Sequence, residues 1–223
     1  MVLHDWHTWL VCSVFLPKVP QGGRVLDLGC GYGRLSRVIV ERRPDIELIG
    51  QDLAFTYCKL FRRNLGVCVQ ADALRLPFVE GCFDAVLAVT CLMYAPRSQV
   101  LDLLRGLRAI LHPRGTILLL DPGLELQRLI GSLRGAKAAS PTGGNGFGRH
   151  EYHQLVADAG FLITGRGGNP CLSQTLLLPG MARAHSQWRL ALIRHGMAHD
   201  CRLEGYARMA VHRWIAAERP DYA

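Results

Sequence analysis

The sequence predicts an α/β protein with a doubly wound sheet of seven mostly parallel strands, an antiparallel last strand and extra C-terminal helices. The first observation is that short apolar segments alternate with amphipathic ones over residues 21–178, which indicates right-handed β-α-β crossovers. The second is the continuous apolar run at residues 82–89, typical of a strand buried on both faces of a parallel sheet. The third is a turn at residues 29–33 with glycine at every second position, directly after a strand.

The 223 residues suit a single domain, and 49% hydrophobic residues are enough to fill its core. We divide it into an N-terminal helix (1–20), a core (21–178) and a C-terminal helical extension (179–223). The eight cysteines include no C-x-x-C pair, so we expect neither a metal site nor disulfides, and a cytoplasmic location. The apolar run from Trp9 to Leu16 is too short for a membrane span and lacks the basic flank of a signal peptide.

The N-terminal segment is predicted to be an amphipathic helix over residues 3–16. Trp6, Leu10 and Val14 recur at helical spacing, and Pro17 and Pro20 end the segment. Packing on the sheet accounts for this pattern. The alternative is that the helix closes over a binding site.

The glycine turn follows the strand Val25-Leu26-Asp27-Leu28 and precedes a helix that begins near Leu35. Its spacing, Gly29-x-Gly31-x-Gly33, differs from the G-x-G-x-x-G of dinucleotide sites, and the Gly-Lys-Ser/Thr of a P-loop is absent. A plain tight turn is the remaining alternative. Because glycine has no Cβ, a ligand can lie against such a turn.

Two further strands end in acids. Glu47–Gly50 is predicted to be a strand that leads to Asp52, about 20 residues beyond the glycines, where a carboxylate can accept bonds from ribose hydroxyls. A helix is expected over residues 55–64. The next strand, residues 67–71, leads to Asp72 and Ala73.

These motifs resemble those of the class I S-adenosylmethionine-dependent methyltransferases, and in particular the small-molecule enzymes similar to those of ubiquinone and menaquinone biosynthesis. The glycine turn is similar to their D-x-G-x-G-x-G motif, Ala71-Asp72-Ala73 to their third motif, and Phe83-Asp84-Ala85-Val86 to their F-D-x-V strand. The resemblance covers about residues 21–178 and implies S-adenosylmethionine as the cofactor. It implies a contact with the methionine end for Asp27, Gly29, Gly31 and Gly33, with the ribose for Asp52, and with the adenine for Asp72, Ala73 and Leu53, while Thr90 lies beside the reacting methyl group.

The second half continues the alternation. We expect a helix over residues 100–111, a strand over 116–120, a short helix over 124–134 and a mobile loop over 136–148 that acts as a lid. A helix over 150–159 then precedes an antiparallel pair of strands, 161–165 and 172–178. Two amphipathic helices, 181–197 and 202–217, complete the chain and offer a surface for a homodimer.

The expected activity is methyl transfer to a small molecule, by O-, N- or C-methylation, with an aromatic or other secondary metabolite as acceptor. We expect Trp6, His7, Met93, Tyr94 and Tyr152 to line the acceptor site, and His150 or His153 to act as general base, with His4 and His7 as further candidates. The alternative for each is a histidine at a helix end or on the surface without a catalytic role. No Asn-Pro-Pro-Tyr motif follows the fourth strand.

The alternatives are an RNA or carrier-bound substrate and a non-catalytic scaffold that only binds the cofactor. The net charge of +8 comes mostly from arginine, and a compositional bias explains it as well as a polyanion partner does. Six arginines lie within residues 181–217, but no RNA-recognition module is recognisable there. We therefore expect no nucleic-acid partner.

Overall fold

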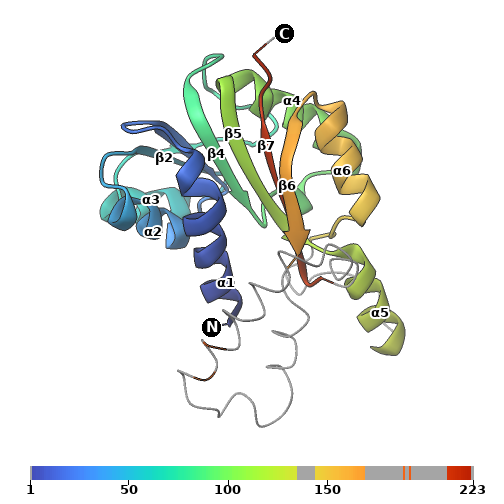
Figure 1. The fold of residues 1–223 in the computed structure, drawn as a ribbon. Coiled ribbons are helices and arrows are strands. Elements are labelled where there is room, and N and C mark those ends of the chain that lie inside the picture. Colours follow the sequence, from blue (N-terminus) through green and yellow to red (C-terminus); the bar gives the residue numbers. More distant parts are fainter. Residues whose placement is uncertain (1, 135–143, 169–187, 189–190, 192–209, 222–223) are drawn as a thin grey trace.

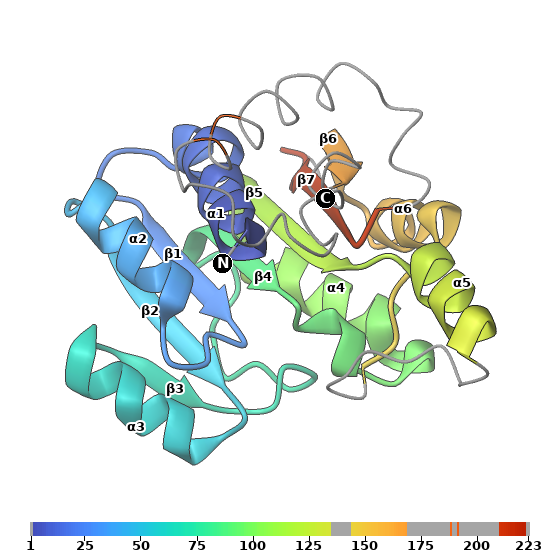
Figure 2. The ribbon, with the colours of Figure 1, turned by 90° about the horizontal axis from the view of Figure 1, so that it is seen from below.

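The computed structural model describes residues 2–134, 144–168, 188, 191 and 210–221. Its centre is a seven-stranded sheet in the order β3-β2-β1-β4-β5-β7-β6 (Figures 1 and 2). Strands β1 to β5 are parallel, and β7 is antiparallel to both of its neighbours, β5 and β6. The strands are β1 (Arg24–Leu28), β2 (Glu47–Asp52), β3 (Cys68–Gln70), β4 (Phe83–Val89), β5 (Leu111–Pro122), β6 (Leu162–Gly168) and β7 (His212–Glu218).

Helices cover both faces of this sheet (Figure 2). One face carries α1 (Val2–Leu10), α2 (Arg34–Arg42) and α3 (Phe55–Asn64), and the other carries α4 (Val100–Ile110) and α6 (Arg149–Asp158). Helix α5 (Leu124–Arg134) follows β5 and extends away from the sheet (Figure 1). The predicted doubly wound α/β class is confirmed, and the expected ranges of α3 and α5 match the observed ones.

The N-terminal helix belongs to the core. After α1 the chain continues through a π-helical segment, Val11–Phe15, and a short 3-10 helix, Leu16–Lys18. Trp6, Leu10 and Phe15 are each at most 2% exposed and pack with residues of α2, α3 and the sheet. The segment therefore packs against one face of the sheet and contributes to its core, while the alternative that it closes over the binding site stays a prediction.

One segment was predicted incorrectly. Residues 202–217 were expected to form a helix, but residues 212–218 form β7, and residues 202–209 lie outside the described part. Trp214 and Ala216 pack on the α1 side, whereas Ile215 and Ala217 pack on the α4 and α6 side. This alternation has the period of a strand, and the apolar residues on both faces explain why the segment also resembles an amphipathic helix.

Other predicted elements lie in parts of the chain that the structure does not describe. The proposed strand at 172–178 lies wholly outside the described residues, as do the helix at 181–197 apart from 188 and 191, and the loop before residue 144. Among the helices that are described, none is long and apolar enough to cross a membrane. A search of the same described residues finds no cluster of His, Cys, Asp and Glu that could hold a metal ion.

Candidate active site

The glycine turn lies at the carboxyl edge of β1, as predicted. Gly29, Gly31 and Gly33 all have positive φ angles, of 66°, 54° and 81°. A Cβ on Gly31 would meet no heavy atom within 4 Å, so this glycine leaves open space beside the backbone. A Cβ on Gly33 would instead collide with Leu65 of the segment after α3. Gly31 thus makes room for a ligand, while Gly33 allows close packing of α2 against α3.

Two of the predicted acids support this turn from different sides. Asp52, at the end of β2, accepts the Gly31 N–H at Oδ2 (2.9 Å) and the Ala54 N–H at Oδ1 (2.8 Å). Asp27 is buried beneath the turn and accepts the Ser36 hydroxyl. Its burial raises the pKa of the Asp27 carboxyl to about 6, although the Ser36 hydrogen bond and Arg34 oppose this rise.

The turn opens into a cavity of about 490 Å³ along the carboxyl edge of β1, β2 and β4. Seven of the nine predicted cofactor residues line it: Gly29, Gly31, Asp52, Leu53, Asp72, Ala73 and Thr90. Asp72 accepts the Leu74 N–H at Oδ1 (3.0 Å), which fixes the carboxylate at the wall. Tyr32 and Tyr57, which were not predicted, also line the cavity and are about half exposed.

A smaller cavity of about 140 Å³ adjoins the same turn, lined in part by Asp27, Thr90 and Arg34. Arg34 and His7 share a hydrogen bond of 2.9 Å between Nη2 and Nδ1, which links α1 to the start of α2. Burial lowers the pKa of the Arg34 guanidinium. Sequence reasoning missed Arg34, although its position directly after the last glycine of the motif was a usable signal.

Thr90, at the end of β4, lines both cavities in an unusual backbone conformation. Its φ is 53°, a region that β-branched residues rarely adopt because of steric strain. The Thr90 N–H donates to the Leu120 carbonyl (2.6 Å) and its hydroxyl to the Val89 carbonyl (2.7 Å). These bonds hold the strained residue at the point where the chain leaves the sheet.

The residues expected to bind the acceptor are not brought together. Tyr94 lines the large cavity and is 56% exposed, whereas Trp6, His7, Met93 and Tyr152 are buried in the protein and do not line it. Their role in acceptor binding stays a prediction. The burial of these four side chains could not be seen in the sequence.

Tyr152 has a structural role. Its hydroxyl donates to Asp121 Oδ2 (2.8 Å), and Asp121 Oδ1 accepts the Met93 N–H (3.0 Å). Burial raises the pKa of the fully buried Asp121 carboxyl to about 7, and it also raises the pKa of the Tyr152 hydroxyl. The pair therefore connects α6, β5 and the segment after β4 behind the large cavity.

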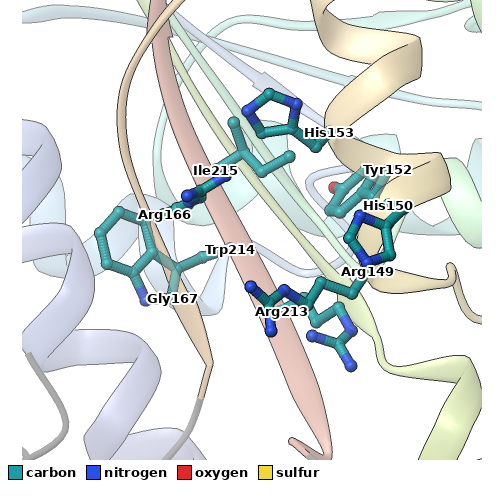
Figure 3. Close-up of a pocket in the computed structure, with 9 residues that line it drawn as sticks. All are labelled: Arg149, His150, Tyr152, His153, Arg166, Gly167, Arg213, Trp214 and Ile215. Carbon is teal, nitrogen blue, oxygen red and sulfur yellow. The ribbon is translucent and has the colours of Figure 1, made fainter. Parts of the chain in front are cut away.

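The candidate bases lie elsewhere. His150 and His153, on α6, line a separate cavity formed with β6 and β7 (Figure 3). Neither histidine lines the cavity of the glycine turn. Their catalytic role stays a prediction. The side chain of His4 is outside the described part of the chain.

Comparison with known proteins agrees with this geometry. Residues 25–115 match the model of a family described as a methyltransferase domain. The chain contains a class I methyltransferase domain. This domain is 37% identical over 113 residues to a demethylmenaquinone methyltransferase of Thermus thermophilus, covering 48% of the chain and 49% of that protein. It is also 30% identical over 100 residues to a malonyl-[acyl-carrier protein] O-methyltransferase of Legionella pneumophila, covering 43% and 34%.

The methyltransferase domain also has the fold of solved structures. A SAM-dependent methyltransferase from Archaeoglobus fulgidus has a TM-score of 0.68 at 17% identity, and the likeness covers 97% of this chain and 94% of that one. By contrast, the sequence alignments span half or less of the two curated relatives. The structural likeness thus covers nearly the whole chain, whereas the family model matches residues 25–115, which include the glycine turn.

S-adenosylmethionine is the cofactor of such a domain, and the residues of the large cavity fit it. The open space at Gly31 admits a ligand against the backbone. The carboxylates of Asp52 and Asp72 face the cavity at the ends of neighbouring strands, where they can accept hydrogen bonds from hydroxyl and amino groups. The exposed Leu53 provides an apolar surface for a flat ring.

Proposed function

We propose that this protein transfers the methyl group of S-adenosylmethionine to a small-molecule acceptor. The observation that carries the proposal is the cavity in which the glycine turn, Asp52 and Asp72 meet beside the residues that follow β4. A scaffold that only binds the cofactor would not need room beyond it, whereas Tyr94, Ala95 and Pro96 extend the lining beyond the proposed cofactor residues. We propose a cytoplasmic location and a role in biosynthesis.

The roles of the residues follow from their positions. We assign the ribose hydroxyls to Asp52, the adenine to Asp72, Ala73 and Leu53, and the methionine end to Gly29 and Gly31. Arg34, in the adjoining cavity, suits a carboxylate because its guanidinium offers a planar pair of donors. When bound, the cofactor supplies an electrophilic methyl group on a sulfonium.

We assign the rate enhancement mainly to positioning. No histidine, lysine or arginine is among the described residues that line the large cavity. Holding the acceptor in line with the reacting methyl group can supply effective molarities of about 10⁵ M or more. Thr90 holds the end of β4 in a fixed, strained conformation, so it suits the placement of groups at the reacting centre.

The acceptor that we favour is aromatic or otherwise apolar. Tyr32, Tyr57 and Tyr94 each line the large cavity and are about half exposed, and aromatic side chains favour flat, apolar ligands. The alternative acceptor is carried by a protein, as the name of the Legionella pneumophila relative states for its own substrate. An RNA acceptor and a non-catalytic scaffold remain as further alternatives.

The test is incubation of the protein with cofactor carrying a labelled methyl group and fractionated cell extract. We expect the label to enter small molecules that pass a membrane with a low molecular-weight limit. Label in the protein or RNA fraction would replace the small-molecule proposal. The matched control is the Asp52→Asn variant, which at a cofactor concentration below saturation should transfer much less label to every fraction if the signal arises from this site.

A further inference from the structure

The cavity lined by His150 and His153 has a volume of about 240 Å³ and lies between α6 and the strands β6 and β7 (Figure 3). Its described lining contains three arginines, Arg149, Arg166 and Arg213, together with His150 and His153, and no carboxylate. The five side chains come from three different elements. Such a convergence of basic groups on one cavity differs from a solvated basic surface, where charges are spread along a single helix.

One of the arginines is held rigidly. Arg213 is only 3% exposed, and its Nη2 lies 2.6 Å from Oε2 of Glu125. Glu125 Oε1 also accepts the Arg149 N–H (2.8 Å). Burial opposes ionisation of Glu125, but the hydrogen bonds from the Arg149 backbone and from Arg213 leave its pKa below the usual value. Glu125 thus positions Arg213 and the first turn of α6 without itself being one of the described residues that line the cavity.

The other basic groups are more accessible. Arg149 and His153 are half-buried, and Arg166 and His150 are exposed. Arg149 and His150 belong to the first turn of the ten-residue helix α6. The Gly148 and Arg149 N–H groups at this end already donate to Glu151 and Glu125, so the side chains provide the free donors. Guanidinium groups bind phosphate and carboxylate through paired donors.

The cavity is separate from the cofactor site. The buried Tyr152, with its hydrogen bond to Asp121, forms part of the wall between them, and the two linings share no described residue. Strands β5 and β7 lie between β4, which ends just before Thr90, and β6, which carries Arg166. At about 4.8 Å per strand, the two positions are roughly 14 Å apart across the sheet.

We propose that this cavity between α6, β6 and β7 binds an oxyanion of the size of phosphate or diphosphate. The guanidinium donors of Arg149 and Arg166, with the imidazole N–H groups of the two histidines, match the acceptor oxygens of such a group. The anion comes either from a free phosphate-bearing metabolite or from the phosphate end of a long acceptor. Both sources have the same recognition chemistry.

The binding test uses inorganic pyrophosphate as the probe and isothermal titration calorimetry of the full chain without cofactor. The informative variants are Arg149→Gln and Arg166→Gln, because Arg213→Gln would leave Glu125 without its ion-pair partner and could unfold the protein. Arg63→Gln is the matched control, since Arg63 is exposed on α3, beyond the opposite half of the sheet. It removes the same charge far from the cavity.

We expect the unmodified protein and Arg63→Gln to bind one pyrophosphate with equal affinity, and each cavity variant to bind it roughly tenfold or more weakly. Affinity for S-adenosylhomocysteine should be unchanged in all variants. No binding to the unmodified protein, or equal binding to all variants, would overturn the proposal. Because no methyl transfer is measured, the result is independent of the activity proposed above.

A second experiment identifies the source of the anion by adding pyrophosphate to the labelled-methyl assay. If the anion is the end of the acceptor, pyrophosphate should lower the transfer of label, and the labelled product should be retained on an anion exchanger. If the anion is a free metabolite, the labelled product should not be retained. Where pyrophosphate lowers the transfer of label, Arg166→Gln should remove that inhibition, and inhibition that persists in this variant counts against the site.

Discussion

Replacement of Asp52 by asparagine tests the assignment of the cofactor site with little change in shape. The carboxylate accepts the Gly31 and Ala54 N–H groups, and an ionised carboxylate has about four acceptor positions. Two positions therefore remain for the ribose hydroxyls. In Asp52→Asn one oxygen becomes an NH₂ group, so one backbone N–H and one ribose hydroxyl lose their acceptor.

The size of the effect follows from the loss of a hydrogen bond to a charged group. Such a bond contributes about 1.5 to 3 kcal/mol, which corresponds to a roughly 10- to 150-fold weaker affinity. The assay is calorimetric titration with S-adenosylhomocysteine, with thermal unfolding to show that the variant is folded. Asp102→Asn is the matched control, because Asp102 lies on α4 with a 75% exposed side chain.

The refuting result is specific. If folded Asp52→Asn binds S-adenosylhomocysteine as tightly as Asp102→Asn and the unmodified protein do, the ribose does not meet Asp52. The cofactor would then lie elsewhere in the cavity, and the proposed roles of Asp72 and Leu53 would fail with it.

Three further predictions concern the turn, the buried acid and the last strand. Gly31→Ala should weaken S-adenosylhomocysteine binding at least tenfold in calorimetry, with a small loss of melting temperature. Gly33→Ala should instead destabilise the fold in urea titration by about 2 kcal/mol or more, because of the positive φ at this position and the collision of a Cβ with Leu65. Equal melting temperatures of the two variants would contradict this. Because the pKa of Asp121 is raised to about 7, the folded state loses stability as the pH rises from about 4 to about 7. In Asp121→Asn the amide oxygen can accept the Met93 N–H and the amide NH₂ can donate to the Tyr152 oxygen, so the variant should gain stability relative to the unmodified protein over the same pH range in urea titrations; a constant difference would refute the assignment. Removal of residues 210–223 should abolish cooperative thermal unfolding in circular dichroism, and a truncated protein that melts like the full chain would exclude a central role for β7.

The cofactor side of the site could be predicted because its determinants are local. Asp27 and Asp52 lie in or at the end of apolar strands, and parallel strands bring such ends to one edge of the sheet. The acceptor side depends on packing between distant segments. Tyr152 and Met93 are buried because α6 and the segment after β4 both meet Asp121, and no local pattern reports that contact.

Strand β7 is a second case in which contacts between distant segments, not visible in the local sequence, decide the structure. Its partners are residues 116–122 of β5 and residues 162–168 of β6, so its place in the sheet depends on pairing across long stretches of chain. Trp214 and Ile215 give it apolar residues on both faces, a pattern shared with buried helices when the run is short. The helix predicted at 202–217 follows from that ambiguity.

The position of β7 also affects how the protein is made. In the described sheet β6 pairs with β7 alone, so it cannot join the sheet until the ribosome has synthesised residues 212–218. About 50 residues separate the end of β6 from the end of β7, a delay of roughly 3 to 10 s at bacterial and eukaryotic rates of translation. During this interval the backbone edges of β5 and β6 are both unpaired, and such edges are sites of aggregation. The nascent chain therefore exposes both edges to other chains until β7 fills the gap between them.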